Sequence, residues 1–406
     1  MSMTSDDSMR LDLDNPAWVA DPYPSFARLR SAGHAVRDER LGIWLAARHA
    51  DVEAVLKSRK LGRIFHEREP LDVWETFNWL HAESILDSEP PKHTRLRRLV
   101  SAVFTRPYVE SLRPRVTQLT QELLDAATIK HADTGHFDVL ADYAEPLPVL
   151  VIAELLGVPE GDRDLLRPWS QAIVQMYEYD RTAELEAAAR VACAEFAMYV
   201  RDLARERRGG DGGDLVTALA NVEDGGERLS EHELVATCVL LLNAGHEASV
   251  NAFGNGIVAA FEHPDQLARL FADPWGMAAT AVEEFLRYDS PLHLFERTAY
   301  EDVSVAGVTV AAGTKIAVLL GAANRDPEVF ADPDKFDVGR DPNPHLGFGV
   351  GIHFCLGGPL ARMEMGISLP LLLERFPTLN LVAEPVRRPT FVLRGYESIL
   401  VGEPRR

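Results

Sequence analysis

Cysteine is scarce in this sequence, which contains only Cys193, Cys238 and Cys355 among 406 residues. They are widely spaced and odd in number, which argues against a disulfide framework and for a reducing compartment. We therefore predict a cytoplasmic protein.

Long apolar runs are also missing. The longest, around Val235–Leu242 and Leu147–Ile152, fall far below the roughly 20 residues that a membrane-spanning helix needs. The first residues are polar and acidic, and no basic region leads into an apolar stretch, so we expect neither a signal peptide nor a membrane anchor. We interpret residues 1–20 as a loose tail.

Basic residues are in deficit, with 42 Lys and Arg against 62 Asp and Glu, and the formal net charge is -20. A charge of this sign repels phosphate backbones and anionic lipid surfaces. Nucleic acid and membranes are therefore poor candidate partners.

Helical spacing of apolar residues is the commonest pattern in the chain. With 46% hydrophobic residues, it predicts a mainly α-helical protein with small β-sheets, in which residues 21–406 form one large helical domain with a minor β-rich region. The helical segments are Tyr108–Ala127, Tyr143–Leu156, Ala183–Arg207, Glu231–Phe261, Pro264–Phe271 and Met277–Tyr288. Strand-like alternation occurs at Ala35–Ala46, Val303–Val310, Lys315–Leu320 and Thr390–Val401.

The most informative stretch is FGVGIHFCLG, from Phe348 to Gly357, which precedes a helical pattern that continues through Leu371. Glycines allow close approach to a flat cofactor, and a following helix N-terminus stabilises a thiolate at Cys355. The alternative is a buried structural cysteine in a tight turn.

This stretch resembles the cysteine-ligand loop of the cytochrome P450 family. The resemblance implies the fold of that family and a haem b cofactor whose iron is bound by Cys355. The residues that match the family's loop are Phe348, Gly349, Gly351, His353, Cys355 and Gly357. We interpret Cys193 and Cys238 as small core residues.

Glu284 and Arg287 lie three apart on one helix face and can pair. By itself this spacing is typical of a solvated surface pair, but its place ahead of the cysteine loop resembles the family's buried Glu-x-x-Arg pair. The long Asp- and Pro-rich segment Asn324–Pro344 brings Lys335 to the position of the usual third member, a role that Arg340 could take instead.

The resemblance also implies basic residues around the two haem propionates, because buried carboxylates need paired donors. The residues at the matching positions are His93, Arg97, Arg297 and His353. Arg95 and Arg98 are interpreted as a solvated helix side or as part of the surface that meets a redox partner, together with Arg362. The expected partner is a ferredoxin- or flavin-type electron donor.

The segment Ala244–Ser249 resembles the family's oxygen-binding stretch. Glu247 matches the acidic residue that relays protons, but Ala248 stands where threonine is usual. The hydroxyl of Ser249 is turned by about 100° from that position, so a substrate hydroxyl or a trapped water must substitute. His246 is expected to be a solvated or helix-capping side chain rather than a relay.

Aromatic and aliphatic residues at family pocket positions imply a mostly apolar small-molecule substrate. Small residues at Ala244 and Gly245 should leave room above the iron. The predicted lining includes Trp74, Phe77, Trp79, Leu241, Ala244, Gly245, Leu294, Phe295 and Phe391. Further candidates are Phe65, Leu80, Leu292 and the segments Trp169–Tyr179 and Phe391–Tyr396.

The sequence thus predicts a haem-thiolate monooxygenase that uses dioxygen and two electrons from a redox partner. Ala248 suggests an alternative, peroxide-driven oxidation or oxidative coupling by a haem-thiolate enzyme. Further alternatives are a haem- or ligand-binding protein without turnover and a helical protein without haem.

Overall fold

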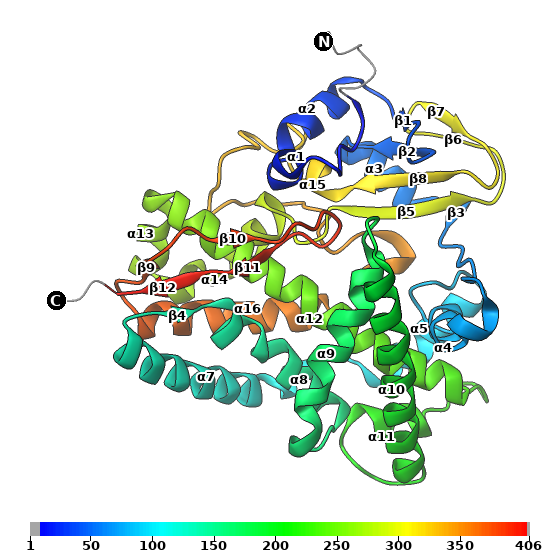
Figure 1. Cartoon of the computed structure of the whole chain (residues 1–406), viewed down its shortest axis with the longest axis horizontal. Helices are drawn as coiled ribbons and strands as arrows, with labels where there is room; N and C mark the ends of the chain where they lie inside the picture. The colour runs from blue at the N-terminus through cyan, green and yellow to red at the C-terminus, as the bar shows by residue number, and fades with distance from the viewer. Residues whose placement is uncertain (1–8, 404–406) are drawn as a thin grey trace.

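The computed structural model describes residues 9–403, and helices make up most of it (Figure 1). The prediction of a mainly α protein with small sheets is confirmed. The helices are α1 Pro16–Ala20, α2 Tyr23–Ser31, α3 His49–Lys57, α4 Leu71–Ala82, α5 Lys92–Val103, α6 Arg106–Ser111, α7 Arg113–Thr134, α8 Pro146–Leu156, α9 Arg163–Val174, α10 Ala183–Arg207, α11 Leu215–Asn221, α12 Glu231–Glu262, α13 Pro264–Ala272, α14 Pro274–Tyr288, α15 Leu320–Ala323 and α16 Gly358–Arg375.

The largest sheet lies toward the top of Figure 1, with strand order β1-β2-β8-β5-β3. Its strands are β1 Val36–Asp38, β2 Ile43–Ala46, β3 Leu61–Gly62, β5 Leu294–Ala299 and β8 Lys315–Leu319. Only β2 and β8 pair in parallel in this sheet. The smaller sheets are β4 Phe137–Asp138 with β12 Leu400–Gly402 and β9 Asn380–Leu381, β6 Val303–Val305 with β7 Val308–Val310, and β10 Val386–Arg387 with β11 Tyr396–Ser398.

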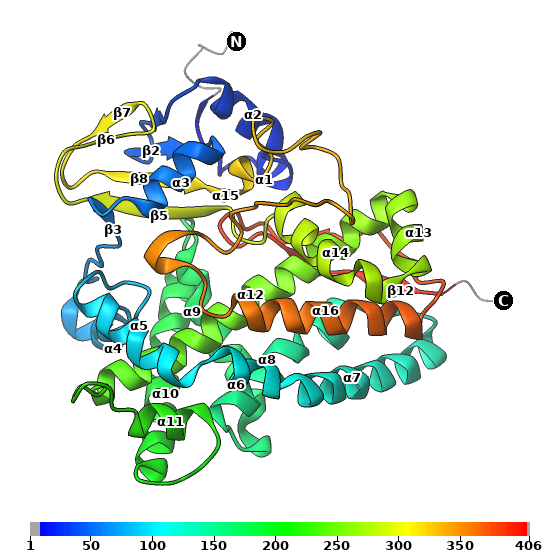
Figure 2. The same ribbon diagram turned by 180° about the vertical axis from the view of Figure 1, so that it is seen from behind.

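Helix α12 is the longest helix in the described chain and crosses the helical layer (Figures 1 and 2). It begins at a capping box, in which the Ser230 side chain accepts from the Glu233 backbone amide and the Glu233 carboxylate accepts from the Ser230 amide. Most of its side chains are buried against α4, α8, α9, α10 and α14. The segment Ala244–Ser249, in the middle of this helix, therefore lies in the interior of the helical layer.

The interpretation of residues 1–20 as a loose tail is wrong for residues 9–20, while residues 1–8 lie outside the described part. Leu11 is fully buried, and its amide donates to the Asp38 carboxylate at 3.0 Å. The carbonyls of Val19 and Ala20 each accept a hydrogen bond from Arg394. Buried apolar side chains anchor this segment. That residues 21–406 form one domain remains a prediction.

Cys193 and Cys238 are fully buried in the helical core, as predicted. Burial in this apolar environment raises the pKa of each thiol to about 12. Among residues 9–403, none of the helices combines the length and apolar character needed to cross a bilayer.

Candidate functional site

The loop that carries Cys355 lies between a 3₁₀ turn, Gly351–His353, and the start of α16. The Cys355 amide donates to the Phe348 carbonyl at 2.9 Å, which closes the loop. Gly349 and Gly351 have φ values of +67° and +81°. A Cβ at Gly351 would also come within 2.9 Å of a backbone oxygen. Glycine is therefore required at both positions.

Burial and the polar neighbours of the Cys355 sulfur act in opposite directions on its pKa, and burial has the larger effect. Burial raises the pKa of the thiol, whereas the backbone amides of Gly357 and Gly358 and the guanidinium groups of Arg97 and Arg362 act to lower it. These amides belong to the start of α16, where the helix dipole favours an anion. The loop therefore has the donors that a metal-binding thiolate requires.

Basic side chains of α5 contact this loop, and a further buried basic side chain lies on β5. His93 of α5 is buried, and its ring lies 4.4 Å from that of His353. Its Nε2 has no hydrogen-bond partner within the described part of the chain. Burial and the charge of His353 lower the pKa of His93 to about 4. Arg97, one turn further along α5, donates to the Phe354 carbonyl at 2.8 Å.

Arg297 on β5 is the third basic residue. It is buried, and no carboxylate lies within ion-pair distance of it among residues 9–403. Burial and the neighbouring Arg63 lower its pKa to about 10. A buried cation without a direct counterion and the unpartnered nitrogen of His93 fit a group with two carboxylates, such as haem.

The predicted pair on α14 is fully buried, which confirms the buried interpretation. Glu284 accepts from Arg287 Nε at 2.7 Å and from Nη2 at 2.8 Å. The third member is Arg340, whose Nε lies 3.2 Å from Glu284. Lys335 provides only its backbone carbonyl, to Arg287 and Arg340. A planar guanidinium suits this carboxylate better than an ammonium group does.

On α12, Glu247 is buried and forms an ion pair with Arg388, which follows β10. Ala248 and Ser249 are half-buried, and Ala244 faces open space. Gly245 does not leave room above the cysteine loop as expected, because a Cβ there would lie 2.3 Å from Ile152 Cδ1. That glycine instead permits close packing of α12 on α8.

The expectation of a solvated or helix-capping His246 is wrong. The side chain is fully buried in the middle of α12, and neither ring nitrogen has a partner within residues 9–403. Burial, with Arg167 and Arg388 nearby, lowers its pKa to about 3. The ring is therefore neutral at physiological pH. Sequence periodicity did not predict this burial, because it assumes one solvated helix face, whereas neighbouring elements cover nearly every face of α12.

A small cavity of about 20 Å³ lies between α4, α9 and α12, which is room for about one water molecule. One side is apolar and the other polar, and the Asn243 Oδ1 atom is buried without a partner within the described residues. The lining residues are Leu80, His81, Ser84, Asp87, Ile173, Tyr177, Ala236, Val239, Leu240 and Asn243. Leu80 was predicted as a pocket residue, and Ile173 and Tyr177 lie in the predicted lining segment Trp169–Tyr179. The other lining residues were not predicted, although Asn243 directly precedes the segment Ala244–Ser249.

Two of the predicted pocket residues on α4, Trp74 and Phe77, are buried with their rings 5.3 Å apart. Trp79 instead stacks on His232 at 4.3 Å and so faces the start of α12. Leu241 is partly buried against the helical core.

Leu294 and Phe295, two further predicted pocket residues, are neighbours on β5, so their side chains point to opposite faces of the sheet. Phe295 lies beside the Arg63 and Arg297 guanidinium groups, at 5.5 and 5.9 Å. Leu294 points to the opposite face, into a core cluster that also holds Phe391. Leu294 and Phe391 therefore belong to the core, which corrects their assignment to the pocket.

Glu178 lies in the segment Trp169–Tyr179 that was predicted to line the pocket, but its role in holding another segment was not predicted. It follows α9, and its carboxylate accepts hydrogen bonds from three consecutive backbone amides, those of Phe391, Val392 and Leu393, at 3.1, 3.0 and 2.8 Å. Its isolated position in the sequence gave no signal, because the partners are backbone groups more than 200 residues away.

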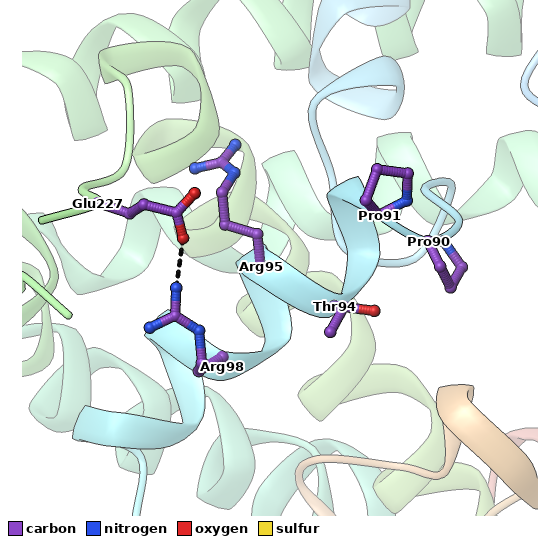
Figure 3. A pocket seen from close by; sticks show the side chains of 6 residues that line it. All are labelled: Pro90, Pro91, Thr94, Arg95, Arg98 and Glu227. Atoms are coloured by element: carbon purple, nitrogen blue, oxygen red, sulfur yellow. Dashed lines mark hydrogen bonds and ion pairs between the residues drawn. The ribbon is translucent and has the colours of Figure 1, made fainter. Parts of the chain in front are cut away.

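The arginines expected to meet a redox partner are all ion-paired within the chain. Arg362 binds Glu283 at 2.6 Å, Arg95 pairs with Glu233, and Arg98 pairs with acidic residues that precede α12. Arg98 is exposed and Arg95 partly so, as expected for a solvated helix side, but both are ion-paired within the chain. Figure 3 shows Arg95 and Arg98 on one wall of a surface pocket.

The cysteine loop, the converging basic residues and the helical fold define a haem-thiolate protein. A sequence profile described as Cytochrome P450 matches residues 277–395. The cytochrome P450 monooxygenase PikC of Streptomyces venezuelae is 42% identical over 391 residues, which cover 94% of this chain and 91% of that protein. The 6-deoxyerythronolide B hydroxylase of Saccharopolyspora erythraea is 39% identical over 405 residues, covering 96% and 98%.

Among solved structures, P450BioI in complex with hexadec-9Z-enoic acid ligated acyl carrier protein matches with a TM-score of 0.90. The identity is 34%, and the match covers 96% of this chain and 99% of that one. The chain belongs to the cytochrome P450 family, and its activity is that of a haem-thiolate monooxygenase.

Proposed function

We propose that this monooxygenase uses haem b, dioxygen and two electrons from a ferredoxin- or flavin-type donor to hydroxylate a mostly apolar small molecule in the cytoplasm. The balanced reaction converts R–H, O₂, two electrons and two protons into R–OH and water. The observation that carries the proposal is the contact of His93 and Arg97 with the Cys355 loop, together with buried Arg297 near Glu89, whose carboxylate bonds His353 of the loop. The names of the relatives, a monooxygenase and a hydroxylase, support it.

Each residue has a separate part. Bound haem supplies the oxidising chemistry, which thiolate donation favours. Cys355 is the metal ligand, and His93, Arg97, Arg297 and His353 hold the propionates. Phe348, Gly349 and Gly357 shape the loop beside the cofactor.

Proton delivery depends on groups at the α12 site. Glu247 holds a proton-relay position while Arg388 orients its carboxylate. Ala248 has no hydroxyl, and the Ser249 hydroxyl makes no hydrogen bond to another described residue of the chain. The substrate, or a water that it holds, therefore supplies the missing hydroxyl.

The cavity beside α12 has room for about one water molecule, and the unpartnered Asn243 Oδ1 can accept a hydrogen bond from it. The proposal of a mostly apolar substrate therefore rests on the aromatic and aliphatic residues at the predicted pocket positions.

The test measures product formed per reduced nicotinamide consumed, with peroxide quantified, for a hydroxyl-bearing substrate and its deoxy analogue. The deoxy compound should bind but release more reducing power as peroxide. Equal and high coupling for both would contradict substrate assistance. Ala248 favours one second function, peroxide-driven oxidation or oxidative coupling, and product formed from peroxide without any electron donor would identify it.

A further inference from the structure

Two guanidinium groups meet at one indole ring in the first half of α4. The guanidinium carbon of Arg68, in the segment between β3 and α4, lies 5.0 Å from the centre of the Trp74 ring, and that of Arg190 on α10 lies 5.3 Å from it. Arg68 also lies 5.4 Å from the ring of Phe77. Helices α4 and α10 pack side by side (Figure 1). Two cations therefore cover rings that the sequence predicted as pocket lining.

The cations at this place outnumber their counterions. Arg68 pairs with Glu186 at 3.2 Å, whereas Arg190 forms no ion pair among residues 9–403, although Glu186 precedes it by one turn of α10. The Nε atom of Arg190 is buried and has no hydrogen-bond partner in the described chain. Burial and the like charge of Arg181 lower the pKa of Arg68. Arg181 itself donates to backbone carbonyls and pairs with no carboxylate of the described segments.

Arg68 is held in place, and the rings beside it lead toward α12. The Arg68 amide donates to Asn78 Oδ1 at 2.9 Å, and its carbonyl accepts from Asn78 Nδ2 at 3.0 Å. Asn78 is buried on α4. The ring of Phe77 stacks on that of His81 at 4.0 Å, and His81 lines the small cavity beside α12. The cations thus lie at one end of an aromatic wall whose other end reaches α12.

This arrangement has the chemistry to recognise an amphiphilic anion. A guanidinium group binds a carboxylate through paired N–H donors, and an aromatic wall favours a hydrocarbon. On a chain with a formal charge of -20, a bound anion needs a local excess of cations, because charges beyond about a Debye length are screened.

We propose that Arg68, Arg181 and Arg190 bind the carboxylate of an apolar acid, whose hydrocarbon part lies along the aromatic wall toward α12. This inference rests on the proposed function, because it names the class of that substrate. The charged end is held apart from α12, so the hydrocarbon part is presented to the oxygen-binding stretch. Arg190 has the largest unused hydrogen-bonding capacity of the three, since its Nε has no partner within residues 9–403.

The test measures the Kd of the haem-loaded protein for decanoic acid, decan-1-ol and decan-1-amine by calorimetry. The three probes share one chain and differ in the charge of the end group at neutral pH. The parent should bind the acid about tenfold more tightly than the alcohol and the amine most weakly, with the preference falling as salt is added. Arg68→Gln/Arg190→Gln should lose the preference for the acid. Arg190→Lys should retain part of it, because an ammonium group keeps the charge without the fork of donors.

The matched control is Arg37→Gln/Arg113→Gln, which removes the same charge, in part from an arginine that lies over the Trp44 ring at 5.7 Å on β1. The control should bind all three probes as the parent does. Equal affinity for acid and alcohol in the parent, a preference that survives in Arg68→Gln/Arg190→Gln, an equal loss in the control or no binding of any probe would overturn the proposal. Absence of the thiolate absorption from the reduced carbon monoxide complex of the parent would instead count against the haem-thiolate function.

Discussion

Removal of the Glu284 carboxylate is expected to destabilise the fold strongly. In the parent it neutralises Arg287, which is fully buried, and Arg340, and it accepts from the Asp337 amide at 2.8 Å and from Asn343 at 3.1 Å. In Glu284→Ala these donors lose their acceptor. Backbone carbonyls still bind Arg287, but they carry no compensating charge. An uncompensated buried charge of this kind costs about 3–5 kcal/mol.

The free energy of unfolding is measured by urea denaturation with linear extrapolation, alongside haem content after expression. The matched control is Glu53→Ala, which breaks an exposed pair with Lys57 four residues away on α3 and should change stability by no more than about 0.5 kcal/mol. A loss below about 1 kcal/mol for Glu284→Ala, with normal haem content, would show that the buried network does not stabilise the fold.

Three further outcomes are expected. Cys355→Ala should abolish the thiolate absorption of the reduced carbon monoxide complex. Cys193→Ser and Cys238→Ser should retain this absorption, because both thiols lie in the helical core. Loss of the absorption in either serine variant would contradict the assignment of Cys355 as the ligand. Burial raises the pKa of Glu364 from 4.5 to about 8, so its contribution to stability is complete below pH 4.5 and is lost as pH rises toward 8. Glu364→Gln should therefore gain in urea midpoint relative to the parent over that range, and a pH-independent difference would refute this. Ala248→Thr should reduce the difference in coupling between a hydroxylated substrate and its deoxy analogue, and an unchanged difference would argue for another proton source.

Short continuous motifs, interpreted through their resemblance to the cytochrome P450 family, predicted much of the site. The cysteine loop is continuous in sequence, and His93 and Arg97 lie four apart on one helix, so their shared face follows from helix geometry. The helix Ala183–Arg207 has the predicted bounds, because Thr182 caps its first turn and charged residues mark its end.

Other features depend on distant contacts that no local pattern contains. The pairing of Glu247 with Arg388 joins positions 141 residues apart. Arg340 rather than Lys335 completes the buried pair because the path of the loop brings the Arg340 guanidinium to the Glu284 carboxylate. No local sequence motif indicates this contact. Leu294 was misplaced because β5 was not predicted as a strand, so its alternation could not be applied.

Glu178 holds the chain at residues 391–393 through main-chain amides alone. Every amino acid except proline presents such an amide, so these three hydrogen bonds do not depend on the side chains of residues 391–393. Phe391 and Val392 are nevertheless buried in a core cluster, so only partly buried Leu393 can vary while the backbone path is retained. Substitution of Glu178 should be tolerated much less, because its carboxylate alone supplies the two oxygens that accept from these three amides.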